Sequence, residues 1–485
     1  MCKATKLSGP GWLLSALLLT APVGCFSETV HFDSGRSDVG GDNARDAGGG
    51  NARDADSGDA RDAGGGNASD AGGDSASDAD SGGAASSVES SKSALARVSA
   101  PSTGNVPALG ASNARFAFEL YHRIAESNAG KNLIFSPYSI STASAMIYEG
   151  ARGTTESELK STLHYDLDKP ALHEAFNATA LALDTRGAGK QGADGTPFRI
   201  HVNNSIWAQS GYPIVPAFLD VMAVNYGAGV LQTDFANNPD GARKAINGWV
   251  SDQTEQLFPE LLKPGVIRRN TTFVLTNTVY FNAGWQKTFD KLRTKNAPFT
   301  RLDGSTVSTR MLDDHFWIPY VEGENYRAIT LPYNDDKLRF VAVLPAEGAL
   351  ASVETELSGS WFDRLNSQWK NASLNVILPQ LDYEQQTDLN EQLMALGVHA
   401  AFGDADFSGL TSRPIAIDAV VHLATLKVFE GGTIAAAVTG YVGTTISGVA
   451  SDDTIRFDRP FLLAIVDQPT GGVLFLGRVL DPTKK

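Results

Sequence analysis

Five consecutive octads near the N-terminus divide this 485-residue chain into two parts of different composition. Residues 43–82 read NARDAGGG, NARDADSG, DARDAGGG, NASDAGGD and SASDADSG, in which alanine is the only apolar residue. Such a segment cannot bury enough apolar surface to offset the entropy of ordering. We therefore expect residues 25–106 to be a disordered linker rich in Asp, Gly and Ala, and residues 107–485 to form one folded domain.

The linker carries much of the negative charge of the chain. Between Cys25 and Ala100 there are 14 acidic and six basic residues, a net charge of −8 out of −15 for the whole sequence. Calcium-binding β-helical repeats are an alternative reading of the octads, but those repeats need a larger apolar residue in each unit. No Lys/Arg cluster with interleaved aromatic residues occurs, so neither a nucleic acid nor a polyanion activator is predicted as a partner.

The N-terminus has the layout of an export signal. Lys3 and Lys6 precede a mostly apolar run, residues 12–23, which is too short to span a membrane. Residues 1–24 are therefore predicted to be a signal peptide. Cys25 follows directly, and the residues before it resemble the lipobox of bacterial lipoproteins, except that Pro22 replaces the usual Leu.

We accordingly expect an exported protein, either extracellular or anchored to the outer membrane by a lipid on Cys25. The alternative is an incidental cysteine beside an ordinary cleavage site. Cys2 and Cys25 are the only cysteines, so the folded region can form no disulfide and must be stable through packing alone.

From about residue 107 onward, helical and strand patterns alternate irregularly, which predicts the α+β class. Residues 112–127 place apolar side chains at helical spacing, whereas residues 273–281 and 338–344 are rich in β-branched and aromatic residues, as buried strands are. Residues 461–466 and 473–476 predict a terminal hairpin. No repeat or linker divides this region, so a single domain is expected.

Motifs for catalysis are absent from the sequence. No G-x-S-x-G elbow or nucleotide-binding loop occurs, and residues 149–155 (EGARGTT) contain glycine without matching either loop pattern. His173 and Glu174 are followed by Asn177 where a zinc-binding helix would need its second histidine. We predict no enzyme, no cofactor and no metal, although an enzyme on an unrelated fold remains the most distant alternative.

The most unusual stretch is Glu430–Ser451, which begins EGGTIAAAV and consists mostly of small residues. Two glycines provide a hinge, and a run of alanines can join a sheet without needing large pockets. From composition alone, an ordinary surface loop after a strand is the simpler interpretation.

Six motifs along nearly the whole folded region change this interpretation. They are NLIFSPYSISTASAM (132–146), INGWVSDQTE (246–255), TNTVYFNAGWQKTF (276–289), ADFSGL (405–410), VVHLATLKVFEGGT (420–433) and FDRPFLLAIVDQPTGGVLFLGRVLDP (457–482). In order and spacing, these motifs resemble those of the serpin family. The resemblance implies three β-sheets, about nine helices and an exposed reactive-centre loop. It also implies that the largest sheet can accept the cleaved loop as an extra strand, a behaviour for which serpins are a standard example.

The resemblance also implies roles for single residues. Ser136, Asn277 and His422 match the shutter, the polar cluster beneath the strands that part on insertion; alternatively they are three satisfied polar residues of the core. Trp285 matches the breach tryptophan at the top of the sheet, and would also serve as a core aromatic. The hinge of the loop comprises Glu430, Gly432, Thr433, Ala435, Ala436 and Ala437.

Insertion would turn alternate loop residues inward, namely Thr433, Ala435, Ala437 and Thr439, all of which are small. Ile434 departs from the acidic residue of most inhibitory members but would point outward, whereas Tyr441 is bulky for an inward position. The family spacing from Glu430 places the cleaved bond between Ile446 and Ser447, within a window from Thr445 to Val449.

We therefore expect a serine-type endopeptidase inhibitor that acts once, by loop cleavage, acyl-enzyme formation and insertion into the central sheet. The β-branched and small residues around the bond favour an elastase-like or subtilisin-like target over a trypsin-like one, and a cysteine protease is the further alternative. The expected partner is therefore the target protease. The protein is expected to contact a membrane only through the lipid and to be a monomer. The alternative is a non-inhibitory serpin acting as a binding module.

Overall fold

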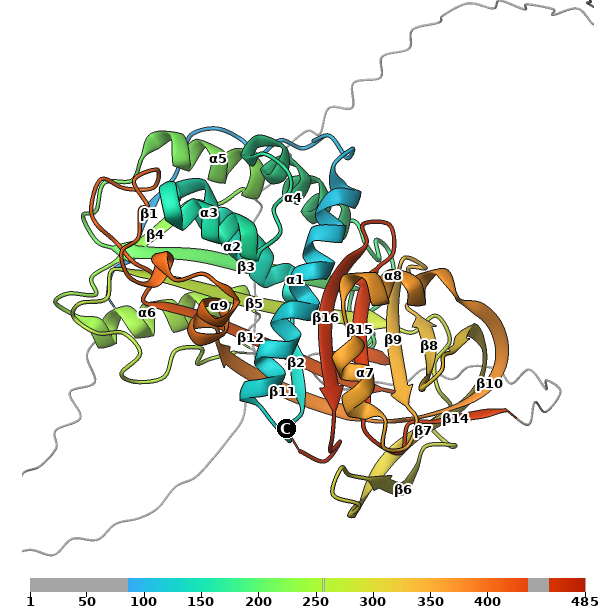
Figure 1. The fold of residues 1–485 in the computed structure, drawn as a ribbon. Helices are drawn as coiled ribbons and strands as arrows, with labels where there is room; N and C mark the ends of the chain where they lie inside the picture. Colours follow the sequence, from blue (N-terminus) through green and yellow to red (C-terminus); the bar gives the residue numbers. More distant parts are fainter. Residues whose placement is uncertain (1–85, 255, 257, 435–452, 485) are drawn as a thin grey trace, which may run out of the picture. The chain divides into compact units, whose positions relative to one another are not determined.

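The computed structural model describes residues 86–254, 256, 258–434 and 453–484 (Figure 1). In this part of the chain, helices and strands alternate irregularly, which confirms the α+β class. The helices are α1 (Val106–Ser127), α2 (Pro137–Gly150), α3 (Gly153–Thr162), α4 (Lys169–Asp184), α5 (Pro216–Tyr226), α6 (Pro239–Gln253), α7 (Leu350–Glu356), α8 (Gly359–Ser367) and α9 (Asn390–Leu396), with a 3-10 turn at Ala400–Phe402.

The strands form two hydrogen-bonded sheets. The first contains β1 (Glu89–Ser91), β4 (Val230–Thr233), β3 (Arg199–Gln209), β5 (Phe273–Gly284), β13 (Gly432–Ile434), β12 (Ala419–Phe429) and β11 (Leu381–Asp388), in this order. The second contains β14 (Thr454–Arg456), β10 (Lys370–Pro379), β7 (Thr306–Glu322), β8 (Tyr326–Pro332), β9 (Leu338–Pro345), β15 (Phe461–Asp467), β16 (Gly472–Val479) and β2 (Leu133–Phe135), with β6 (Lys295–Thr300) beside β7.

Two of the three predicted sheets are joined in the second sheet by the 17-residue strand β7, which is long enough to pair with a strand of each. Residues 311–320 of β7 pair with β10, and residues 320–322 pair with β8. Strand β7 therefore connects the strands around β10 with the strands around β8. The predicted strands correspond to β5 and β9, and the predicted terminal hairpin to β15 and β16, which pair antiparallel.

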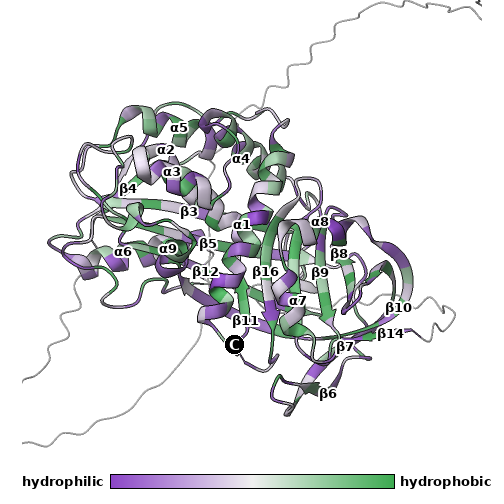
Figure 2. Ribbon diagram, viewed as in Figure 1, coloured by the Kyte–Doolittle hydropathy of each residue, from purple (hydrophilic) through white to green (hydrophobic). Residues whose placement is uncertain are grey.

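The core lies between the two sheets and the helices that cover them. Helix α1 packs on β16, and α2 contacts β16, β5 and β3. All twelve residues of β5 are buried, including the polar residues Thr276, Asn277, Thr278 and Asn282. Figure 2 shows hydrophobic residues concentrated in β9 and β16.

The first sheet has a distinctive joint between β5 and β12. Residues 274–279 of β5 pair in parallel with residues 419–424 of β12. Beyond this ladder the two strands separate, and β13 lies between them, antiparallel to both. The beginning of the predicted reactive-centre loop therefore already occupies a strand position in this sheet.

The folded domain includes residues that precede residue 107, where the sequence analysis placed its start. Strand β1 pairs antiparallel with the outer edge of β4, and the backbone N–H of Val98 donates to Val224 O at 2.9 Å. Arg97 Nε donates to Asn177 Oδ1 on α4 at 2.8 Å. The sequence prediction missed this N-terminal segment, residues 86–104, because it is held by hydrogen bonds and contains few large apolar residues.

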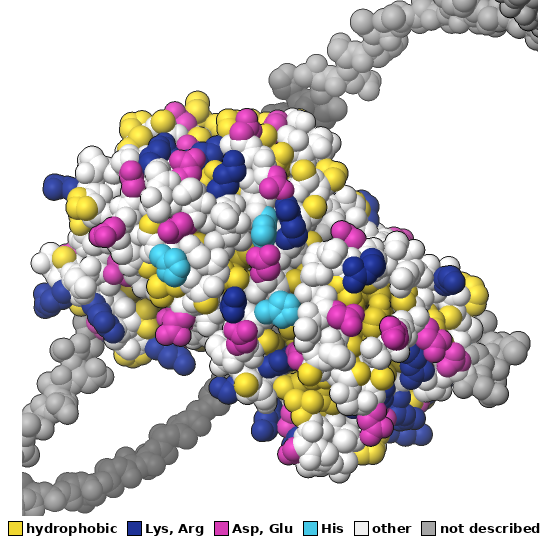
Figure 3. All heavy atoms as spheres, viewed as in Figure 1, with side chains coloured by type: hydrophobic (Ala, Val, Ile, Leu, Met, Phe, Trp, Pro, Cys, Tyr) yellow, Lys and Arg dark blue, Asp and Glu magenta, His cyan; other side chains and the backbone are white. Residues whose placement is uncertain are grey.

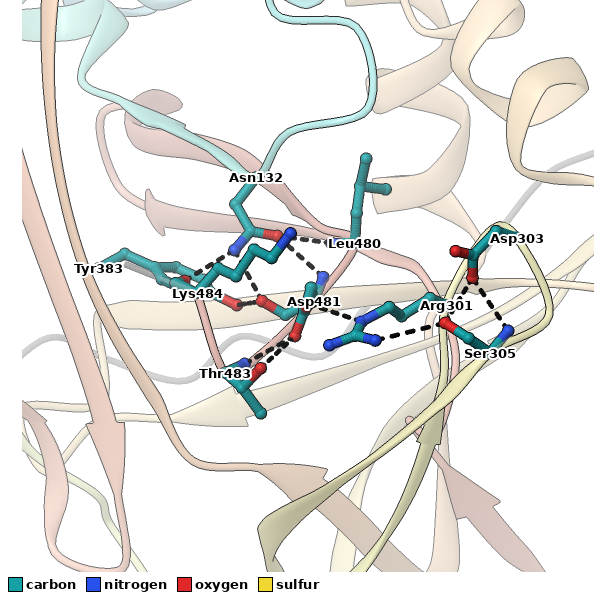
Figure 4. A network of polar contacts seen from close by, with 9 residues as sticks. All are labelled: Asn132, Arg301, Asp303, Ser305, Tyr383, Leu480, Asp481, Thr483 and Lys484. Atoms are coloured by element: carbon teal, nitrogen blue, oxygen red, sulfur yellow. Dashed lines mark hydrogen bonds and ion pairs between the residues drawn. The ribbon is translucent and has the colours of Figure 1, made fainter.

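The C-terminal residues are fixed to the domain by a polar network (Figure 4). Asn132 Oδ1 accepts from the backbone N–H groups of Leu480 and Asp481 at 2.8 and 3.0 Å, and Arg301 Nε donates to Asp481 Oδ2 at 2.6 Å. On the face seen in Figure 3, acidic and basic side chains are interspersed. Among the described residues, no helix has both the length and the apolar character needed to cross a membrane.

Candidate functional site

The joint between β5 and β12 carries the polar residues singled out by the sequence. Asn277 and His422 are direct neighbours in the parallel ladder between the two strands. Helix α2 begins beneath them, where Pro137 starts the first turn and the Ser136 hydroxyl accepts a hydrogen bond from Ser139 N at 3.3 Å. The N-terminus of α2 is thereby aimed at the joint.

A continuous hydrogen-bond chain crosses this joint. Ser136 N donates to His422 Nε2 at 3.0 Å, and His422 Nδ1 is hydrogen-bonded to Asn277 Oδ1. The Asn277 amide then donates to Ser139 Oγ and to Asn204 Oδ1 on β3. We call these five residues, Ser136, Ser139, Asn204, Asn277 and His422, the shutter cluster; their hydrogen bonds tie β3, β5, β12 and α2 together.

His422 is neutral in this arrangement. A backbone N–H can only donate, so Nε2 must carry a lone pair, and the proton is on Nδ1, facing the Asn277 carbonyl oxygen. The side chain is fully buried, and this burial lowers the pKa of His422 from 6.5 to about 3. A proton added to Nε2 would break the contact with α2.

The structure brings Asn277 and His422 together, but it gives Ser136 a different part from the expected one. Its hydroxyl caps α2, and its backbone reaches the histidine. The hydroxyl that contacts Asn277 belongs to Ser139. Sequence reasoning missed Ser139 and Asn204; Asn204 follows Asn203 in an otherwise strand-like segment, which signals a polar site without revealing its partner.

Trp285 lies at the top of the same joint, where β13 enters. Its indole Nε1 donates to Phe429 O at 2.9 Å, and its backbone N–H donates to Gly431 O at 2.9 Å. The ring stacks on Tyr333 with a centroid distance of 4.7 Å and an interplanar angle of 14°. Trp285 is thus a core aromatic that also holds both ends of the turn between β12 and β13.

The predicted hinge residues that the structure describes make close contacts here. Glu430 is buried, its carboxylate accepts from Gln380 Nε2 at 3.0 Å, and it lies 3.5 Å from the Arg310 guanidinium. At Gly432, an added Cβ would come within 2.2 Å of the Ala283 carbonyl oxygen. Glycine is therefore needed at this position for the close approach of β13 to β5.

Thr433 is the last residue of the loop whose side chain the structure describes. It is 1% exposed, and its hydroxyl is hydrogen-bonded to the Tyr333 hydroxyl at 2.8 Å. Several predicted site residues lie outside the described residues: Ala435, Ala436, Ala437, the Ile446–Ser447 bond with its window from Thr445 to Val449, and Cys25.

We expect Tyr333→Phe to loosen the hinge, because Thr433 would lose its hydrogen-bond partner in a buried environment. The expected cost is about 1–2 kcal/mol of local stability. Hydrogen exchange at the Thr433 amide and the rate of loop cleavage by a non-target protease would measure it. In a double-mutant cycle, Thr433→Val should lower the local stability only slightly when Tyr333 has already been replaced by Phe. If the losses of the two single variants add up in the double variant, the two hydroxyl groups are not directly coupled.

This arrangement, a strand-like loop segment entering between two strands over a buried polar cluster, defines a class of proteins. A family model described as Serpin (serine protease inhibitor) matches residues 111–482, and the chain belongs to the serpin family. A leukocyte elastase inhibitor of Sus scrofa is 36% identical over 388 residues, which cover 77% of this chain and 99% of the relative. An uncharacterized serpin-like protein of Thermococcus kodakarensis is 34% identical over 370 residues, covering 76% and 84% respectively.

Solved structures agree with the fold. Human thyroxine-binding globulin, determined in complex with thyroxine, superposes with a TM-score of 0.70 at 28% identity and covers 79% of this chain and 100% of its own. Tengpin, a thermophilic serpin in its native state, superposes with a TM-score of 0.69 at 27% identity and covers 77% and 94% respectively. The family match supports protease inhibition in general.

Proposed function

We propose that the protein inhibits a serine-type endopeptidase irreversibly, by inserting its cleaved loop between β5 and β12. The observation that carries this proposal is the position of β13. Its three residues already lie between the two strands, while the ladder below them is still closed. The first step of insertion therefore needs no new strand position, only further separation of an existing joint.

The register of β13 indicates where the rest of the loop would go. Thr433 pairs with Ala283 on one side and Val428 on the other. Continuing both ladders by six residues places Thr439 opposite both Asn277 and His422. Because the period of a strand is two, Thr439 would face the same side as Thr433. Its hydroxyl could then replace the direct Asn277–His422 hydrogen bond as the strands part.

The proposed trapping reaction begins with cleavage of the loop at the Ile446–Ser447 bond. The catalytic serine of the protease attacks the carbonyl carbon of Ile446, the fragment beginning at Ser447 leaves as an amine, and an ester bond joins Ile446 to the protease. Insertion then carries the acylated protease to the far end of the sheet, where distortion of its active site prevents hydrolysis of the ester. The apolar residues near the bond, and the name of the Sus scrofa relative, support an elastase-like target; a subtilisin-like enzyme fits the same preference.

The test is to incubate the full-length protein with neutrophil-type elastase, with subtilisin and with trypsin as a control. We expect a denaturant-stable adduct with one of the first two, and release of a fragment that begins at or near Ser447. Cleavage at that bond without an adduct would favour the non-inhibitory alternative, in which the protein acts as a binding module. A fragment that begins outside residues 445–450 would contradict the assigned bond.

We also propose that the protein is exported and held at a membrane surface by a lipid on Cys25. Cys25→Ser should release the protein from the membrane fraction, because no acyl chain could then be attached. Metabolic labelling with a radioactive fatty acid would check this, with Cys2→Ser as the matched control that retains the label. Equal labelling of both variants would contradict acylation at Cys25.

A further inference from the structure

A recess beside β3 has the features of a small-molecule site. It lies between α2, α4 and the strand, and its volume is about 130 Å³. An engineered cavity of about 150 Å³ binds benzene, so this space suits a single aromatic ring. The apolar part of the lining comes from α2, α4, β3 and the second residue after α5: Met146, Ala180, Leu183, Ile200, Val202 and Ala228.

One polar group in this recess has no partner. Tyr138 is 2% exposed, and its hydroxyl forms no hydrogen bond among the residues that the structure describes. The neighbouring Thr142 hydroxyl donates its only proton to the carbonyl oxygen of Tyr138 at 2.8 Å, so it cannot donate to the phenol oxygen. A buried hydroxyl without a partner is unfavourable, so this phenol calls for an additional hydrogen-bonding group in the recess.

The lining also includes Tyr226 and two charged residues. Asp184 extends from the end of α4, and Arg97 reaches over from the N-terminal segment, where Asn177 holds its Nε. Burial raises the pKa of the Asp184 carboxyl, and the Arg97 charge opposes this shift. The two charges offset each other in sum, so a neutral ligand is favoured over an ionic one, and the carboxylate remains a strong acceptor for a hydroxyl proton.

The recess can be reached from the surface. Asp184, Leu183, Ile200 and Val202 also line an adjoining open depression of about 230 Å³. On its inner side the recess ends at Asn204, a member of the shutter cluster. A ligand could therefore enter without opening the joint between β5 and β12, and it would lie next to that joint.

We propose that this recess binds a small neutral aromatic molecule with one hydroxyl group, a compound of the phenol class. The ring packs among Met146, Leu183 and Ile200. The hydroxyl donates to the Asp184 carboxylate and accepts from the Tyr138 phenol. This proposal does not depend on the inhibitory function, because it requires neither a protease nor movement of the loop.

The probes are p-cresol and toluene, which have similar shapes but differ in the hydroxyl. They are titrated into full-length protein labelled with carbon-13 at the methionine methyl groups. The chain has five methionines, so the Met146 methyl serves as a local reporter and the Met311 and Met394 methyls as internal controls. We expect saturable shifts of the Met146 signal alone, with p-cresol binding about five-fold or more tightly than toluene, the difference that one net hydrogen bond supplies.

Two substitutions sharpen the test. Tyr138→Phe should bring the affinities of p-cresol and toluene closer together, whereas Tyr320→Phe, a tyrosine on β7 outside the recess, should leave their ratio unchanged. Ala180→Leu should fill the space and weaken both ligands. Absence of a saturable Met146 shift, or equal binding of the two probes to the unmodified protein, would overturn the proposal; if Ala180→Leu does not fold, the Tyr138→Phe and Tyr320→Phe comparison still decides it.

Discussion

Thr433→Arg should convert the protein from a trap into a substrate: the target protease cleaves the loop at an undiminished rate, but no stable adduct accumulates. Thr433 is 1% exposed and lies between β5 and β12, with its hydroxyl on Tyr333. A guanidinium at this position would be buried without a countercharge, at a cost of several kcal/mol. The hinge would therefore stay outside the sheet, and hydrolysis of the ester would outrun insertion.

The measurement is the number of inhibitor molecules consumed for each protease molecule inactivated, with gels that separate adduct from cleaved protein. Thr433→Ser is the matched control, because it keeps the hydroxyl and adds no charge; it should still form the adduct. An adduct of normal yield from Thr433→Arg would show that insertion does not pass through the position seen for β13.

The second large effect concerns acid. The pKa of His422 is lowered to about 3 in the folded state, against about 6.5 in an unfolded chain. Below pH 6.5 the unfolded state therefore binds a proton that the folded state does not, so the free energy of unfolding falls as pH falls. The slope approaches about 1.4 kcal/mol per pH unit, and the loss attributable to His422 is about 2 kcal/mol between pH 7.5 and pH 5.

Denaturant unfolding at pH 7.5, 6.5, 5.5 and 5 would measure this loss before most carboxylates titrate. His422→Gln should be less stable at neutral pH because it disturbs the shutter cluster, but its free energy of unfolding should depend less on pH across this range. His399→Gln, which alters an exposed histidine, should follow the unmodified protein. If His422→Gln keeps the full pH dependence, another group is responsible for it.

Elements stabilised by local sequence were predictable. The pattern of residues 112–127 identified most of α1, although the helix begins six residues earlier, at Val106, where Pro107 is compatible with a first turn. The runs of β-branched and aromatic residues likewise identified β5 and β9, because such runs are a local signal for buried strands. The N-terminal segment was missed because β1 depends on hydrogen bonds to β4, about 140 residues away, and has no apolar pattern of its own.

The candidate site was predictable only in part. Asn277 and His422 could be named from the family motifs, but their contact with Ser139 and Asn204 depends on how β3, β5 and α2 meet. Likewise, the sequence suggested that Gly432 belongs to a hinge, whereas the reason for glycine, the nearby Ala283 carbonyl oxygen, comes from strand packing. Contacts between distant segments carry no local signal, and they determine which polar residues become partners.

The short strand β1 has a consequence for how the protein behaves in solution. An uncovered outer strand offers its free N–H and C=O groups as a template for another chain, and such edges promote self-association. By pairing with β4, residues 89–91 occupy that template at one edge of the seven-stranded sheet, which also contains β13. A preparation trimmed to begin at residue 101 would lose this cover, and its tendency to aggregate would then reflect the missing strand rather than any instability of the inhibitor itself.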